Sequence, residues 1–155
     1  MFGAGHGRVR DWCGKLIPLV AVILLGSSPT TLIAQSPRAV TVIGLDYAFQ
    51  APDTLQAGPT TLSLLNRGTV RHEVLLFLLN EGRSPAEFLR AALEARISMG
   101  RAVGALFAEP GQPAGAELVV DLTRGRSYLF LCVIRDAPDK PPHVALGMAK
   151  ALVVK

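Results

Sequence analysis

The chain has 155 residues, of which 50% are hydrophobic and 18% are charged, and its formal net charge is +4. This length suits a single domain, and the apolar content excludes an intrinsically disordered chain. Residues 1–35 hold three basic residues and one acidic residue, which leaves thirteen basic and eleven acidic residues, scattered along residues 36–155. Because this balance provides no basic surface, we expect no nucleic-acid partner.

The N-terminus has the pattern of a signal peptide. Arg8, Arg10 and Lys15 precede an apolar run of about ten residues, IPLVAVILLG, which is the usual length of a signal-peptide core. A membrane-spanning helix needs about 20 apolar residues. The small residue Ala34 suits cleavage before Gln35.

We therefore expect a signal peptide over residues 1–34 and an exported domain over residues 36–155, in the periplasm or secreted. The alternative is an uncleaved membrane anchor that continues to Ile33, although polar residues and a proline interrupt that stretch. Cleavage also removes Cys13, so the exported domain keeps Cys132 as its single cysteine and no disulfide partner is expected. An unpaired thiol in an oxidising compartment is expected to be buried or bound to metal.

Short β-strands punctuated by turns dominate the domain. The apolar or alternating segments are AVTVIGL (39–45), TTLSLLN (60–66), HEVLLFLL (72–79), AELVVDL (116–122), SYLFLCVI (127–134) and MAKALVV (148–154). Strands at this spacing indicate an all-β sandwich or barrel, and the continuous apolar run at 72–79 indicates a strand covered on both faces. The Gly-, Pro- and Ala-rich residues 103–116 are expected to form a loop.

One segment predicts a helix among the strands. Ser84 is a candidate N-cap, Pro85 suits the first helical position, and Glu87 completes a capping box. Apolar residues then recur at helical spacing until Gly100. We expect one inserted α-helix of about four turns over residues 84–99, packed on the sandwich as a lid.

Four side chains offer metal-ligand chemistry: His72, Cys132, His143 and Met148. Taken singly, each has an ordinary structural explanation, because Cys and Met commonly fill cores and His commonly lies at strand ends. Together, one thiolate, two imidazoles and one thioether form the ligand set of a trigonal copper site with a weak axial Met. All four are expected at strand ends or in the adjoining loop.

The motifs around these residues resemble those of cupredoxins such as plastocyanin. The matching segments are YLFLC (128–132), PH (142–143), GM (147–148) and NRGTVRHEV (66–74). The resemblance covers residues 39–155 and implies a cupredoxin-like Greek-key β-sandwich. It also implies a single type 1 copper ion held by His72, Cys132 and His143 with Met148 axial, a monomer, and one-electron transfer to redox partner proteins.

Two features depart from the plastocyanin pattern. Glu73 stands where the family usually has an Asn whose side chain ties the two ligand loops together. Ten residues separate Cys132 from His143, where plastocyanin-like proteins have about two. The longer loop costs about 1.4 kcal/mol more to close, which metal coordination can offset.

Other functions remain open beside the electron carrier. A copper storage or delivery protein would use the same four ligands, and a metal-free cupredoxin-like domain would use them only for packing. An enzyme with a Cys132–His143 nucleophile and base is disfavoured, since no helix N-terminus lowers the thiol pKa. For a carrier, Val144, Ala145 and Leu146 are expected to flank an exposed edge of His143 where redox partners dock.

Overall fold

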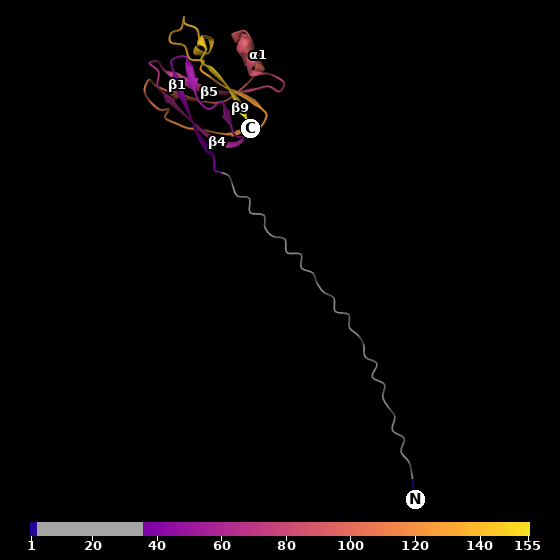
Figure 1. Ribbon diagram of the computed structural model, residues 1–155. Helices are drawn as coiled ribbons and strands as arrows, with labels where there is room; N and C mark the ends of the chain where they lie inside the picture. The colour runs from indigo at the N-terminus through magenta and orange to yellow at the C-terminus, as the bar shows by residue number, and fades with distance from the viewer. Residues whose placement is uncertain (3–35) are drawn as a thin grey trace. The chain divides into compact units, whose positions relative to one another are not determined.

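The computed structural model describes residues 1–2 and 36–155, and residues 36–155 form a sandwich of two β-sheets (Figure 1). The strand order is β2-β1-β4-β7 in the first sheet and β3-β9-β8-β5-β6 in the second. The strands are β1 (Arg38–Leu45), β2 (Ala48–Gln50), β3 (Thr54–Leu55), β4 (Gly58–Asn66), β5 (His72–Leu79), β6 (Gly100–Ala108), β7 (Leu118–Leu122), β8 (Ser127–Leu131) and β9 (Ala149–Val154). The two-sheet sandwich expected from the strand spacing is confirmed.

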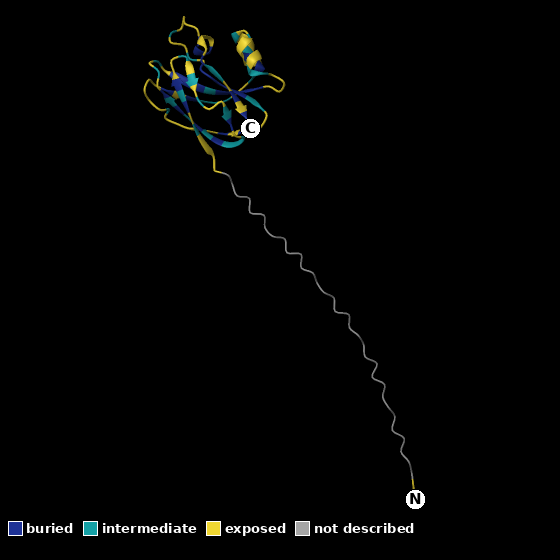
Figure 2. Cartoon of the chain, in the orientation of Figure 1, coloured by how far each residue is buried: buried dark blue, intermediate teal, exposed yellow. Residues whose placement is uncertain are grey.

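The first sheet has one buried face and one exposed face. Alternate residues of β4 are buried, including Leu62 and Leu64, and β4 pairs in parallel with β1 and antiparallel with β7. These side chains meet Phe130 of the second sheet in the core. This alternation is what a sheet with one solvent-exposed face requires. In Figure 2 the buried residues, in dark blue, lie mainly in the strands of the sandwich.

The central strands of the second sheet are covered on both faces. Seven of the eight residues of β5 are buried, as are four of the five residues of β8. One face contributes to the core between the sheets, and the other packs Phe77 and Leu129 against Phe88 of the segment that follows β5. The expectation that residues 72–79 form a doubly covered strand is therefore confirmed.

The helical lid differs from the single helix expected over residues 84–99. It consists of α1 (Pro85–Arg90), α2 (Leu93–Arg96) and a 3-10 turn, Ile97–Met99. The capping box at Ser84 forms as expected. The backbone turns extended at residues 91 and 92, and the Arg96 guanidinium donates to the carbonyls of Leu89 and Ala91. These side-chain bonds satisfy carbonyls that a continuous helix would have bonded internally.

The expectation of a loop over residues 103–116 is also wrong in part, because residues 100–108 form β6. This strand pairs with β5 from Gly100 to Ala108, with a bulge at Val103. Its glycines allow close approach: a Cβ at Gly100 would lie 2.3 Å from the Leu78 carbonyl oxygen, and one at Gly104 would lie 2.6 Å from Leu118. Glycine within a strand often marks a place where a neighbouring segment approaches closely. The glycine content of residues 100–108 resembles that of a loop, so the strand was not expected from the sequence.

Residues 3–34 of the predicted signal peptide, with Cys13 among them, lie outside the described residues, so the signal peptide and the loss of Cys13 stay predictions. Among the residues that the structure describes, no helix is long and apolar enough to cross a membrane.

Candidate metal centre

The four predicted ligands lie at one end of the sandwich. His72 begins β5, Cys132 directly follows β8, and these two strands are antiparallel neighbours. Leu131, the last residue of β8, pairs with Leu75 of β5, so Cys132 lies beside the start of β5. His143 begins a 3-10 turn that ends at Leu146, and Met148 directly precedes β9.

Three of the four offer ligand atoms that converge on one point. The Cys132 Sγ lies 3.3 Å from the His143 Nδ1, and that nitrogen lies 3.2 Å from the His72 Nδ1. All the ligand atoms of this trio fall within 4.8 Å of one another. Each of the three residues is 0% exposed, so the cluster is closed to bulk water.

Met148 is held beside this trio by its backbone. Its N–H donates to the His143 carbonyl at 2.9 Å, and its carbonyl accepts from the Cys132 N–H at 3.2 Å. The N–H of Val144 donates to the Cys132 carbonyl at 2.7 Å. Because Met148 is also 0% exposed, its side chain is packed inside the same end of the sandwich.

Glu73 ties the two ligand-bearing segments together. Its carboxylate accepts a hydrogen bond of 2.7 Å from the N–H of Val133, and its own N–H lies 3.4 Å from the Cys132 sulfur. Burial raises the pKa of this carboxyl, which is 5% exposed. A glutamate thus makes the link that the resemblance assigns to an asparagine.

A buried asparagine shapes the turn before His72. The Asn66 amide donates to the carbonyls of Val70 and Ala108 and accepts from the N–H of Gly68. These three bonds connect β4, the turn and β6, and Asn66 is 0% exposed. The turn therefore delivers His72 to the start of β5 with little freedom, because buried polar groups are costly to leave unpaired.

The Cys132 thiol is chemically quiet without a metal. Cys132 is buried and forms no disulfide with the other described residues, and burial raises the pKa of its thiol. Metal binding requires the thiolate, so an ion that binds here must displace the thiol proton.

No protein-family model and no curated protein sequence matches the chain. Among solved structures, it resembles auracyanin of Roseiflexus castenholzii with 16% identity and a TM-score of 0.50, covering 78% of this chain and 99% of that one. It is also similar to auracyanin A, a blue copper protein of Chloroflexus aurantiacus, with 20% identity and a TM-score of 0.50 over 77% of this chain and 100% of that one.

The chain has the cupredoxin fold. Auracyanin B gives the same result, with 19% identity and a TM-score of 0.50 over 79% of this chain and 93% of that one. The expected fold class is thereby confirmed, and His72, Cys132, His143 and Met148 lie together at one end of it.

The sequence did not predict that Asp46, Tyr47 and Asp136 lie beside the rings of His72 and His143. An Asp46 oxygen lies 3.3 Å from the Nε2 of His72, and an Asp136 oxygen lies 2.9 Å from the Nε2 of His143. The Tyr47 hydroxyl donates to the other oxygen of Asp136 at 2.7 Å. The only sequence signal was an acidic residue in the loop between two expected ligands.

The charge states of these carboxyls follow from their contacts. Hydrogen bonds from the backbone and hydroxyl of Thr69 lower the pKa of Asp46, and those from Tyr47 and His143 lower the pKa of Asp136. Both are therefore carboxylates at neutral pH, and a carboxylate only accepts hydrogen bonds. Desolvation lowers the pKa of His72, which favours its neutral form.

The expectation that one edge of His143 is exposed is wrong. The ring is 0% exposed, because Tyr47 packs edge-on against it at 5.1 Å and Asp136 occupies its outer nitrogen. Of the three residues expected to flank it, Val144 is buried and only Ala145 and Leu146 are exposed. The ten-residue loop from Cys132 to His143 is long enough to fold back over the ring.

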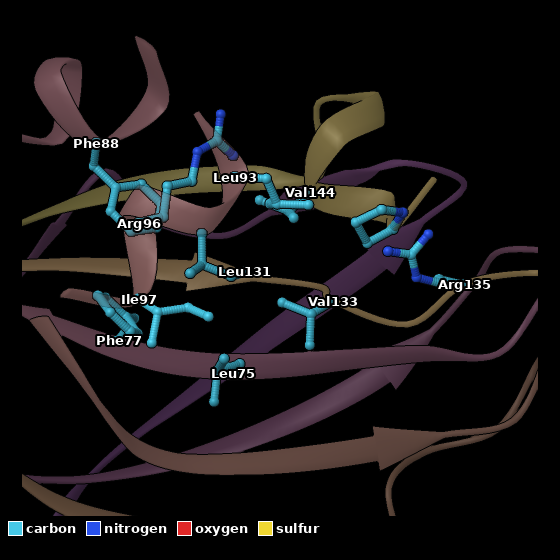
Figure 3. A pocket seen from close by; sticks show the side chains of 11 residues that line it. Leu75, Phe77, Phe88, Leu93, Arg96, Ile97, Leu131, Val133, Arg135 and Val144 are labelled. Atoms are coloured by element: carbon cyan, nitrogen blue, oxygen red, sulfur yellow. The ribbon is translucent and has the colours of Figure 1, made fainter. Parts of the chain in front are cut away.

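An apolar pocket flanks the ligand cluster without containing it. It has a volume of about 350 Å³ and lies between the helical lid and the outer face of the second sheet (Figure 3). Leu131 and Val133 in its wall are the neighbours of Cys132, and Val144 is the neighbour of His143. The pocket therefore shares a wall with two ligand segments, whereas the ligand side chains are not among its lining residues.

Proposed function

We propose that this protein is an exported blue copper protein that carries one electron at a time. The observation that carries the proposal is the convergence of the Cys132 Sγ and two imidazole Nδ1 atoms within 4.8 Å in a fully buried cluster. One thiolate and two imidazoles with a nearby methionine suit copper, and the softness of sulfur favours it over oxygen-loving cations.

The hydrogen bonds around the two rings support a cation between them. Asp46 and Asp136 accept from the Nε2 side of His72 and His143, so a neutral ring keeps its single proton there and leaves Nδ1 bare. The two bare nitrogens lie 3.2 Å apart with only the Cys132 thiol proton to share. A bound cation in place of that proton removes the repulsion between the lone pairs.

Copper held by His72, Cys132 and His143 with Met148 nearby would accept and donate one electron, between its +1 and +2 states. The protein holds the four ligands so that they move little, because low reorganisation favours fast transfer and requires fixed side chains. Backbone hydrogen bonds join the segments of Cys132, His143 and Met148, and the Glu73 carboxylate joins the segments of His72 and Cys132. These contacts form from protein atoms alone.

The same observations count against the other functions. A delivery protein must open its ligands to a partner, whereas His72, Cys132 and His143 are all 0% exposed. A Cys–His enzyme needs a reachable thiolate, whereas burial both closes the Cys132 thiol to substrates and raises its pKa. The carrier requires neither opening nor substrate access, and its redox partners are proteins.

Titration of the purified protein with Cu(II) tests the proposal. We expect one copper ion per chain and an intense visible absorption band, because a short copper–thiolate bond gives strong charge transfer. The Cys132→Ser variant should lose this band while its circular dichroism stays that of a β-sandwich. An intense band that survives in this variant, or no band in the folded wild-type protein, would contradict a copper–thiolate site.

We further propose export with cleavage before Gln35, supported by the basic start and the short apolar run of the sequence. Intact-mass measurement of protein recovered from the periplasm or medium should give a chain that starts near Gln35. Recovery of the full-length chain from the membrane fraction would favour the anchor instead.

A further inference from the structure

A single two-residue turn of this protein reaches both imidazoles of the proposed copper site. Asp46 and Tyr47 connect β1 to β2. Asp46 contacts the Nε2 of His72 directly, and Tyr47 contacts His143 both through its ring and through the Asp136 carboxylate. Two ligands that are 71 positions apart in sequence are thus covered by one turn.

The backbone of this turn is held in an unfavourable conformation. Tyr47 has a φ of 62°, and among the described residues it is the one non-glycine residue with a positive φ. A bulky residue in this region is strained, and such strain persists where surrounding contacts compensate for it. Here the contacts are the 2.7 Å hydrogen bond to Asp136 and the edge-on packing against His143.

The approach of Asp46 to His72 depends on a missing side chain. A Cβ at Gly68 would lie 2.3 Å from the Asp46 oxygen and 2.7 Å from the His72 Nε2, so any larger residue would separate the pair. Asp46 is anchored from the other side by the N–H and hydroxyl of Thr69, each at 2.8 Å. The carboxylate is therefore fixed on the ring by a turn shaped to admit it.

The long loop between Cys132 and His143 supplies the second carboxylate. Asp136 places one oxygen 2.9 Å from the His143 Nε2 and the other 2.7 Å from the Tyr47 hydroxyl. A loop of about two residues would have no room for this return over the ring. The extra length thus produces a specific contact with a ligand.

We propose that Asp46, Tyr47 and Asp136 form a carboxylate cap that positions both imidazoles and lowers the reduction potential of the site. The hydrogen bonds at Nε2 keep each Nδ1 turned toward Cys132, as carboxylate–histidine pairs do in metal sites. The two negative charges favour the state of the site with the higher positive charge, which is the oxidised one. The effect on potential rests on the proposed copper function, whereas the positioning of His143 does not.

Two substitutions of Asp136 separate the hydrogen bond from the charge. Asp136→Asn keeps a side-chain oxygen that accepts from Nε2 but removes the negative charge, and Asp136→Ala removes both. Asp139→Asn is the matched control, because Asp139 is an exposed acid on the same loop. A further variant, Asp46→Asn, repeats the charge test on the other ring.

The first measurement uses the metal-free protein and NMR correlations within the imidazole rings, in mildly alkaline buffer. We expect the His143 proton on Nε2 in the wild type and in Asp136→Asn, and a mixture of both tautomers in Asp136→Ala. An Nδ1 proton on His143 of the wild type, or an unchanged tautomer in Asp136→Ala, would overturn the positioning role. This result is independent of whether copper binds.

The second measurement is the midpoint potential of the copper-loaded variants. Asp136→Asn and Asp46→Asn should each shift it to more positive values, while Asp139→Asn leaves it close to the wild type. A shift in Asp136→Asn no larger than that of the control would overturn the tuning role. If the wild-type protein binds no copper, the proposed function fails while the NMR result still decides the positioning role.

Discussion

Removal of the Glu73 carboxylate should loosen the link between the two ligand segments in the metal-free protein. The Glu73 carboxylate accepts a hydrogen bond of 2.7 Å from the N–H of Val133, and this bond joins the two segments. Glu73→Ala leaves that N–H without its acceptor, which costs about 1–3 kcal/mol of unfolding free energy. A loss of about 2 kcal/mol corresponds to a Tm lower by about 8 °C for a domain of this size.

Glu73→Gln should behave differently, and its effect should depend on pH. Glutamine keeps an oxygen that accepts from Val133 but cannot ionise. Burial raises the pKa of Glu73 above its ordinary value of 4.5, so the unfolded chain ionises first as the pH rises. The wild type therefore loses stability from about pH 4.5 up to the raised pKa, and the glutamine variant does not.

Urea denaturation of the metal-free variants between acidic and neutral pH measures both effects. Relative to the wild type, Glu73→Gln should gain stability as the pH rises, while Glu73→Ala stays the less stable of the two variants throughout. Glu117→Gln is the matched control, because Glu117 is exposed, and it should change little. Equal destabilisation by Ala and Gln would refute the role of the hydrogen bond, and a difference from the wild type that is constant with pH would refute the role of burial.

Two further predictions concern the copper-loaded protein. Met148→Leu should keep the copper and the visible band while shifting the midpoint potential, since an axial thioether tunes a site that the other ligands hold. Met99→Leu is the control, because Met99 is a buried methionine at the end of the lid. Complete copper loss from Met148→Leu would contradict the axial assignment. Amide hydrogen exchange over residues 133–147 should be similar with and without copper, because protein contacts already order this loop; protection only in the copper form would indicate a site formed by the metal.

Much of this protein's architecture can be read from its sequence, because the signals are local. Alternating or continuous apolar runs give the strands, since side chains of a strand point to opposite faces and the sheet buries one or both of them. The motifs around Cys132, His143 and Met148 lie within seventeen residues, so their proximity needs only a turn between two strands. Even His72, far away in sequence, is marked by its place at a strand start.

Features that depend on contacts between distant segments were decided by the tertiary structure. Residues 100–108 have the composition of a loop, yet they form β6 by pairing with β5, where Gly100 lies close to Leu78, while Gly104 makes room for Leu118 of β7. The helical lid breaks at residues 91 and 92, where the Arg96 guanidinium bonds the carbonyls of Leu89 and Ala91. Local propensity carries no information about such partners.

The residues around the two imidazoles show most clearly which features the sequence determines and which depend on the tertiary structure. The sequence by itself determined which residues could bind a metal, because thiolate, imidazole and thioether chemistry belongs to the residue types. It could not place Asp46, Tyr47 and Asp136, whose carboxylates and hydroxyl act only through the pairing of β1 with β4 and the return of the long loop over His143. Only the folded chain decides which polar groups meet a ligand's second nitrogen, because that contact joins residues from three separate segments.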